Sequence, residues 1–175
     1  RKIFNVDPVA VRYSDPERYL ALGRVAGGEL ITRTVAEWRR AESPCSGALV
    51  WLYRDLHPGA GWGVLDHDGA PKAAYYYLAR AYRPVTVVMS DEGLNGIAIH
   101  AINDGPAPIT PELRLSLFRG SVSVGETSVH VRIPERSTVN ISADELLGSF
   151  TDVSYADRFG RPNHDAQMVQ QRLGP

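Results

Sequence analysis

The sequence is poor in cysteine, in net charge and in long apolar runs. Cys45 is the only cysteine in 175 residues, so no disulfide bond can form within the chain and the cellular compartment stays open. The formal net charge of −1 argues against a dedicated nucleic-acid or polyanion binder. No apolar run approaches the roughly 18 residues of a transmembrane helix and no signal peptide is visible, so no membrane partner is predicted. Because the chain begins at Arg1 rather than Met, we expect a segment to precede it.

Aromatic residues and charge are unevenly distributed along the chain. All three Trp and seven of the eight Tyr lie before Pro84. Residues 1–84 carry 12 basic and 9 acidic side chains, a balance of +3, whereas residues 85–175 carry 7 and 11, a balance of −4. This change in composition predicts two domains, residues 1–84 and residues 85–175.

The first 44 residues are typical of helices. Asp7-Pro8 is expected to form a turn. Ser14 to Glu17 supply a capping side chain, a proline at the first helical position and an acid in the first turn. This helix is expected to end at Gly27-Gly28. A second helix is predicted over Glu29–Ala41, with its apolar side chains on one face.

The apolar run Gly47–Tyr53 is the central feature of the first half. No polar residue alternates within it, which predicts a strand buried on both faces, as in a parallel sheet covered by helices. The polar residues that follow stand at the carboxyl end of this strand, where α/β folds place their chemistry. Asp66–Gly69 indicates a tight turn, and Lys72–Arg83 a helix that Pro84 ends.

A single parallel strand cannot form a sheet, because the backbone groups on both of its edges must be paired. Residues 1–84 offer no second strand of this type. We therefore predict that this half is the incomplete end of a larger barrel, whose other strands are missing from the chain.

The stretch from Gly47 to Tyr76 resembles the last strand and helix of the catalytic barrel in the β-mannosidase branch of glycoside hydrolase family two. The matching positions are Gly47, Ala48, Leu49, Trp51, Asp55, Pro58, Trp62, Asp66, Gly69, Pro71, Lys72, Tyr75 and Tyr76. The sequence departs from the family at Leu52, Arg54 and His57, where Gln, Asn and Trp are frequent. These departures fall on the active-site side of the strand and leave the identity of the sugar open.

The second half alternates apolar and polar residues. Short strands are expected at Val85–Met89, within 94–103 and 113–117, and repeatedly between Val122 and Ile141, with turn signals about every ten residues. One helical turn is expected over Ala143–Gly148, a loop over Tyr155–Pro162 and a last strand over His164–Leu173. The predicted fold class is thus α/β plus all-β: the C-terminal remnant of a (β/α)8 TIM barrel, followed by an antiparallel immunoglobulin-like β-sandwich. The family resemblance, which has the same module order, supports this arrangement.

The resemblance also suggests three substrate-binding residues. The family Trp at the position of Trp51 lines the sugar pocket, although a core position between barrel and helices is the alternative. Asp55 is expected to accept hydrogen bonds from sugar hydroxyls, or else to pair with Arg54 or cap the loop. Trp62 is expected to wall the pocket or plug the mouth of the barrel. Arg54 and His57 either shape selectivity or lie on the surface.

The resemblance implies a retaining glycosidase that acts on terminal β-linked sugars. The family's two catalytic Glu precede the matched stretch, so no catalytic residue is assigned here, and the partners expected are a β-mannoside or related carbohydrate and the upstream part of the same polypeptide. No cofactor or metal is implied: Asp66–Gly69 lacks the downstream Glu of a calcium loop. A non-catalytic structural or carbohydrate-binding module is the alternative function, and exo-β-glucosaminidase an alternative specificity.

Overall fold

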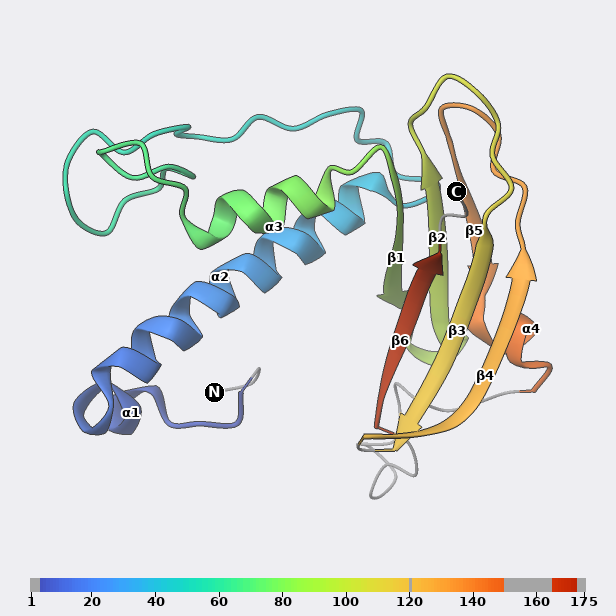
Figure 1. Cartoon of the computed structure of the whole chain (residues 1–175), viewed down its shortest axis with the longest axis horizontal. Helices are drawn as coiled ribbons and strands as arrows, with labels where there is room; N and C mark the ends of the chain where they lie inside the picture. The colour runs from blue at the N-terminus through green and yellow to red at the C-terminus, as the bar shows by residue number, and fades with distance from the viewer. Residues whose placement is uncertain (1–3, 120, 150–164, 173–175) are drawn as a thin grey trace. The chain divides into compact units, whose positions relative to one another are not determined.

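The computed structural model of the chain describes residues 4–119, 121–149 and 165–172 (Figure 1). The chain divides into two compact units. The first comprises Arg1–Trp38 and Cys45–Arg83, and the second comprises Arg39–Pro44 and Pro84–Pro175. Over the described ranges, no helix is long and apolar enough to cross a membrane.

The first unit begins with two helices. Helix α1 (Pro8–Ser14) is capped by Asp7, whose Oδ1 accepts a hydrogen bond from the Val9 amide at 3.1 Å. The expected turn at Asp7-Pro8 is therefore wrong, because a capping Asp followed by Pro at the first position begins a helix. Helix α2 (Pro16–Arg39) begins where predicted, and Asp15 Oδ1 accepts from the Arg18 amide at 3.0 Å.

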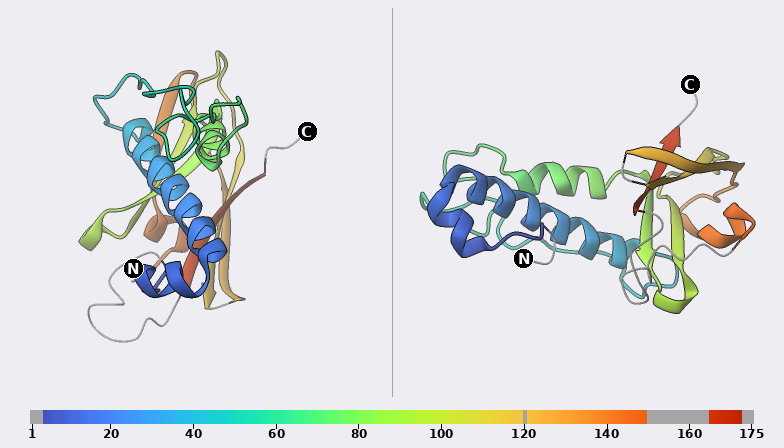
Figure 2. Two further views of the ribbon diagram at one scale, coloured as in Figure 1. Left: turned by 90° about the vertical axis from the view of Figure 1, so that its left-hand side faces the viewer. Right: turned by 90° about the horizontal axis from the view of Figure 1, so that it is seen from below.

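Helix α2 continues without a break through Gly27 and Gly28, so the prediction of two separate helices is wrong. Helix α2 lies beside helix α3 (Ala73–Ala81), as both views in Figure 2 show, and Gly28 of α2 is buried. A Cβ atom added at Gly28 would lie 2.3 Å from Cδ2 of Tyr77. Glycine at this position therefore permits a close approach of the Tyr77 ring instead of ending the helix. Helix α3 and its end before Pro84 agree with the sequence prediction.

The predicted buried strand Gly47–Tyr53 is absent. Gly47–Leu52 belongs to no strand, Leu49 is 100% exposed and Trp51 is 82% exposed. The pairing that follows it consists of isolated bridges, a parallel one between Arg54 and Leu65 and an antiparallel one between Leu65 and Pro71. The described part of the first unit contains no strand that could pair with the apolar run, and an unpaired strand is not stable in water.

The second unit contains two three-stranded antiparallel sheets (Figure 1). One sheet has the order β1-β2-β5 and the other β4-β3-β6. Their strands are β1 (Val85–Asp91), β2 (Ile97–Asn103), β5 (Ser137–Ser142), β4 (Val122–His130), β3 (Glu112–Arg119) and β6 (Asp165–Arg172). A 3-10 turn (η1, Gly93–Asn95) joins β1 to β2, and helix α4 (Ala143–Leu147) follows β5. The period-two pattern thus identified this half as antiparallel β, including the last strand.

The two sheets share one core. Ile99 of β2 packs with Leu113 and Leu115 of β3 and with Ala143 of α4, and each is at most 5% exposed. Asn103, at the end of β2, is also buried, and its amide donates to the carbonyl oxygens of Ala107 at 2.9 Å and Pro134 at 3.0 Å. The expected loop Tyr155–Pro162 lies outside the described residues.

Candidate functional site

The segment from Tyr53 to Lys72 folds back on itself through backbone hydrogen bonds. The amides of Val64 and Leu65 donate to the Tyr53 carbonyl at 3.1 and 3.0 Å, and the Asp55 amide donates to the Leu65 carbonyl at 3.1 Å. The Lys72 amide donates to the Val64 carbonyl at 3.0 Å, which connects the start of α3 to the same segment. The polar residues that follow the apolar run are therefore held close to the beginning of α3.

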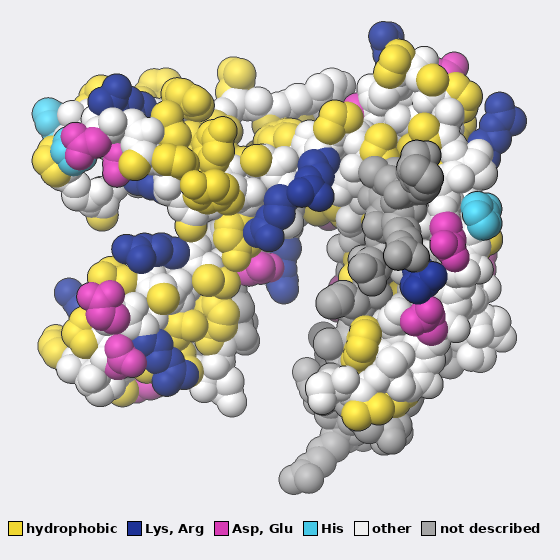
Figure 3. All heavy atoms as spheres, viewed as in Figure 1, with side chains coloured by type: hydrophobic (Ala, Val, Ile, Leu, Met, Phe, Trp, Pro, Cys, Tyr) yellow, Lys and Arg dark blue, Asp and Glu magenta, His cyan; other side chains and the backbone are white. Residues whose placement is uncertain are grey.

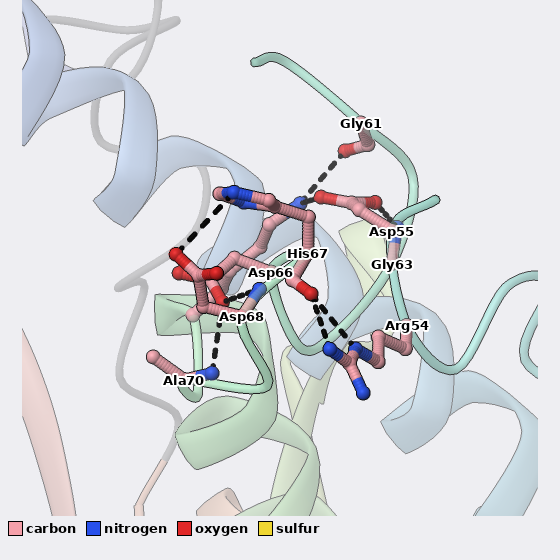
Figure 4. Close-up of polar contacts among 9 residues, drawn as sticks. Arg54, Asp55, Gly61, Gly63, Asp66, His67, Asp68 and Ala70 are labelled. Atoms are coloured by element: carbon pink, nitrogen blue, oxygen red, sulfur yellow. Dashed lines mark hydrogen bonds and ion pairs between the residues drawn. The ribbon is translucent and has the colours of Figure 1, made fainter. Parts of the chain in front are cut away.

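The turn at Asp66–Gly69 is built as predicted. Asp66 Oδ1 accepts from the amides of Asp68 at 3.0 Å and Ala70 at 2.8 Å. The Arg54 guanidinium binds the His67 carbonyl, with Nε 3.0 Å from the oxygen (Figure 4). Across the described part of the chain, no three His, Cys, Asp or Glu side chains come together as a metal site would require.

Asp55 lies at the centre of this segment and is only 6% exposed. Its Oδ1 accepts from the Gly63 amide at 2.6 Å, and its Oδ2 is paired with Lys72 Nζ (Figure 4). Lys72 Nζ also donates to the Gly61 carbonyl at 3.1 Å. The hydrogen bond from Lys72 lowers the pKa of Asp55 from its usual value near 3.8; burial opposes this shift and the Gly63 amide reinforces it. Asp55 is therefore ionised at neutral pH, and its partner is Lys72, not Arg54, which was the alternative that the sequence left open.

Two glycines allow the chain to wrap around this carboxylate. A Cβ added at Gly61 would lie 2.2 Å from Asp55 Oδ1, and one added at Gly63 would lie 2.6 Å from the same atom. Neither residue has a positive φ, so proximity to Asp55 is what demands glycine.

An apolar groove of about 310 Å³ lies beside this segment in the first unit. It is lined by Leu30 and Trp38 of α2, by Trp51 and Trp62, and by Leu78 of α3, among others. Trp51 and Trp62 are 82% and 83% exposed, so most of each indole faces solvent. Hydrophobic side chains gather over α3 and the neighbouring loop in Figure 3. A groove with two open aromatic faces is suited to the apolar face of a sugar ring.

The structure thus brings two of the three predicted site residues together. Trp51 and Trp62 share the groove, whereas Asp55 does not line it and lies buried with both carboxylate oxygens bound to protein groups. Trp38 and Lys72 were not predicted as site residues. Trp38 follows Leu30 by eight residues on α2, so helical periodicity already placed both on one face. Lys72 was among the family matches, but its partner across the loop could not be read from spacing.

The second unit carries a separate polar hollow of about 300 Å³, lined by Arg40, Glu92, His100 and others. Two of its charged side chains are paired with each other: Arg40 Nη1 lies 3.1 Å from Glu92 Oε1. The Ser90 hydroxyl donates to Glu92 and lies 2.8 Å from His100 Nε2. Since these polar atoms bind one another, the hollow is a less suitable ligand site than the apolar groove.

Comparisons with known proteins show what the chain is similar to. No family model matches the chain. The β-mannosidase B of Aspergillus niger is 35% identical over 91 residues, which is 50% of this chain and 11% of the relative. The β-mannosidase B of Aspergillus clavatus is 28% identical over 153 residues, 77% of this chain and 18% of the relative.

Two solved structures are similar to the fold. The β-D-mannosidase from Dictyoglomus thermophilum has a TM-score of 0.64 and 26% identity, over 73% of this chain and 16% of that one. The exo-chitosanase of Amycolatopsis orientalis has a TM-score of 0.61 over 87% of this chain and 19% of its own, but at 12% identity it indicates likeness of fold alone. The chain is therefore similar to glycosidases of the β-mannosidase type, as the resemblance predicted, and spans 11 to 18% of the length of these curated relatives.

Proposed function

We propose that the chain is the C-terminal part of a retaining exo-glycosidase, β-mannosidase-like in specificity. The observation that carries this proposal is the open groove at Trp51 and Trp62, in a chain whose sequence is similar to β-mannosidases. Residues 1–84 form the end of the catalytic (β/α)8 barrel, and residues 85–175 form an immunoglobulin-like sandwich. The two antiparallel sheets with a shared core support the second assignment.

The upstream part of the same polypeptide is the partner that completes the first unit. This unit exposes a nearly continuous apolar segment, including Leu49, Val50 and Trp51. Monomeric proteins rarely expose apolar patches beyond a few hundred Å². Neighbouring barrel strands would pair the backbone of Gly47–Tyr53 and cover its side chains, which is the environment that its sequence pattern predicts.

In this assignment the indole rings of Trp51 and Trp62 form apolar platforms for a terminal β-linked sugar. Hydrogen bonds between sugar hydroxyls and Asp55, the other role predicted from the resemblance, would require a carboxylate oxygen at the surface. Both oxygens are occupied by Gly63 and Lys72, so we assign Asp55 to holding the loop in place and not to binding the sugar.

The catalytic carboxylates are assigned to the upstream polypeptide. A retaining glycosidase needs a nucleophile and an acid/base about 5 Å apart, and the acid requires a raised pKa. Asp55 is unsuited to the acid role, because Lys72 lowers its pKa. The reaction in the complete enzyme proceeds through a covalent glycosyl-enzyme intermediate that water then hydrolyses.

Hydrolysis of chromogenic β-mannoside, β-glucoside and β-glucosaminide tests the proposal. The chain alone is expected to show no turnover. The same chain, replacing the matched segment of the Dictyoglomus thermophilum β-D-mannosidase, is expected to support β-mannoside hydrolysis. In this chimera, Trp51→Ala should lower kcat/KM roughly tenfold, as loss of one aromatic contact of about 1.4 kcal/mol implies.

Leu56→Ala is the matched control, because Leu56 is an exposed apolar residue of the same segment that does not line the groove. Turnover by the chain alone that is abolished by changing one of its own carboxylates would place the catalytic pair within these 175 residues and overturn the assignment.

A further inference from the structure

We infer that Asp55 and Lys72 form a clamp that fixes the position of Trp62 at the edge of the groove. The structural part of this inference stands on the contacts alone, and its consequence for sugar binding rests on the proposed function. Asp55 and Lys72 are accordingly positioning residues, neither of which lines the groove.

The clamp acts on the backbone on both sides of Trp62. Asp55 Oδ1 accepts from the amide of Gly63, the residue after Trp62, at 2.6 Å. Lys72 Nζ donates to the carbonyl of Gly61, the residue before Trp62, at 3.1 Å. The ion pair between Asp55 Oδ2 and Lys72 joins these two contacts. One ion pair, between a buried carboxylate and a half-buried ammonium group, therefore holds both peptide groups that flank the indole.

Trp62 depends on this clamp because its own side chain is held by little else. The indole is 83% exposed, and its two neighbours in sequence are glycines, which confer the least backbone rigidity of any residue. The contacts made through Gly61 and Gly63 thus restrict a loop that would otherwise be mobile. A charge-assisted pair of this kind is roughly twice as strong as a neutral hydrogen bond.

The clamp also ties three segments of the first unit together. Asp55 lies next to the bridge between Arg54 and Leu65, and Lys72 immediately precedes α3. Glycines at 61 and 63 are required for the fit, since a Cβ at either site would lie within 2.6 Å of Asp55 Oδ1. The glycines at 61 and 63, the burial of the Asp55 carboxylate and its hydrogen bonds all favour a role for this pair in holding the loop that carries Trp62.

Fluorine NMR of the full 175-residue chain labelled with 5-fluorotryptophan tests the clamp, because each of its three Trp gives one signal. Trp→Phe variants assign the signals. Lys72→Met is expected to shift and narrow the Trp62 signal while the Trp38 signal stays in place. Lys72→Arg should restore the wild-type signal at least in part, because a guanidinium keeps the charge and the donors. Arg24→Met, which removes a cation from α2, is the matched control and should leave Trp62 unchanged.

The pH profile separates a clamp from a general structural contribution. The charged groups that act on Asp55 are Lys72 and, more weakly, His67. The wild-type Trp62 signal should be constant above pH about 3.8 and change as the pH falls through the lowered pKa of Asp55. Asp55→Asn should abolish this acid transition. A Trp62 signal that is unaltered in Lys72→Met, with the far-UV spectrum intact, would overturn the inference.

Single glycine-to-alanine variants provide a second test that leaves both charges in place. Gly61→Ala should displace the loop and reproduce the Trp62 shift, whereas Gly47→Ala should not, because a Cβ at Gly47 meets nothing within 4 Å. Combining Gly61→Ala with Asp55→Ala removes the clash and should make the two changes non-additive. Equal signals from Gly61→Ala and Gly47→Ala would contradict the proposed geometry.

The functional consequence is measured in the chimeric β-mannosidase. Lys72→Met should raise KM roughly five- to tenfold with a smaller change in kcat, because a displaced platform weakens binding of substrate and transition state alike. An unchanged KM, together with a shifted Trp62 signal, would mean that Trp62 does not contact the sugar. A chimera without any hydrolysis would refute the proposed function, while the NMR result would still decide the clamp.

Discussion

Substitution of the adjacent glycines in α2 tests the packing that supports the site. At Gly28, an added Cβ would lie 2.3 to 2.6 Å from three ring atoms of Tyr77, closer than the 3.0 Å that real Cβ atoms respect. At Gly27 the same atom meets nothing within 4 Å. Both glycines are in the interior of one helix, so the helix-propensity gain of alanine, about 1 kcal/mol, is common to both variants. The difference between the free energies of unfolding of Gly27→Ala and Gly28→Ala therefore isolates the steric cost of the added methyl group at Gly28.

Carbon atoms pack at about 3.5 to 4.0 Å, so Tyr77 must move by more than about 1 Å to admit the methyl group. Such overpacking costs about 1 to 3 kcal/mol. Gly27→Ala should therefore stabilise the chain by up to about 1 kcal/mol, and Gly28→Ala should be less stable than Gly27→Ala by about 1 to 3 kcal/mol. For a chain of this size the two melting temperatures should differ by about 2 to 12 °C.

Urea unfolding monitored by circular dichroism gives the two free energies of unfolding. The Tyr77→Ala background provides the decisive control: without the ring, Gly28→Ala should become as stabilising as Gly27→Ala. If both glycine variants stabilise the wild-type chain equally, then Tyr77 does not pack on Gly28 and α3 is held in another way. The position of Lys72, which immediately precedes α3, would then have to be fixed by contacts other than the packing of Tyr77 on Gly28.

Three further predictions address the acid response, the sandwich and the groove. Because the folded-state pKa of Asp55 is lowered, its contribution to stability is complete above pH about 3.8 and is lost as the pH falls through the lowered value. The difference in urea midpoint between wild type and Asp55→Asn should therefore shrink in this acid range. A difference that stays constant with pH would argue against the ion pair of Asp55 with Lys72. Asn103→Ala leaves buried backbone groups unpaired and should cost about 1 to 3 kcal/mol in urea unfolding, against about 0.5 or less for the exposed Asn140→Ala. The chain should bind an apolar dye and self-associate with concentration in light scattering, and Trp51→Asp should weaken both; a strictly monomeric chain without dye binding would show that the groove is covered.

The second half could be predicted from its sequence because its information is local. Alternation in segments such as Leu113–Leu117 places apolar residues on one face, and that face packs within the same unit. Turn residues such as Asp91 and Gly93 then separate the strands. The pairings of β2 with β5 and of β3 with β6 join strands far apart in sequence, but the alternation within each strand already marks the face that each one buries, so pattern and structure agree.

The first half was harder to predict because its contacts join distant residues. Gly28 has the sequence signature of a helix end, yet it is explained by the ring of Tyr77, 49 positions further along. Asp55 was assigned to the sugar by resemblance, and its partner Lys72 lies across a loop whose path depends on glycines at 61 and 63. Spacing alone carries no signal for such encounters. The exposure of Trp51 was not anticipated either, because the apolar run around it predicted a strand buried on both faces.

The failure at Gly47–Tyr53 is informative about function. The segment has the composition of a strand buried on both faces, but in the described chain it belongs to no strand and its Leu49 is fully exposed. The sequence pattern predicts neighbouring strands, and the described structure contains none beside this segment. We interpret this conflict between local sequence and structure as the absence of the strands that pair with it in the complete enzyme. The same segment carries Trp51 and leads directly into Asp55 and the clamp that holds Trp62. In our proposal, the strands that pair with Gly47–Tyr53 therefore also fix the position of Trp51. Trp51 would then lie across the groove from Trp62, which the clamp already holds in place.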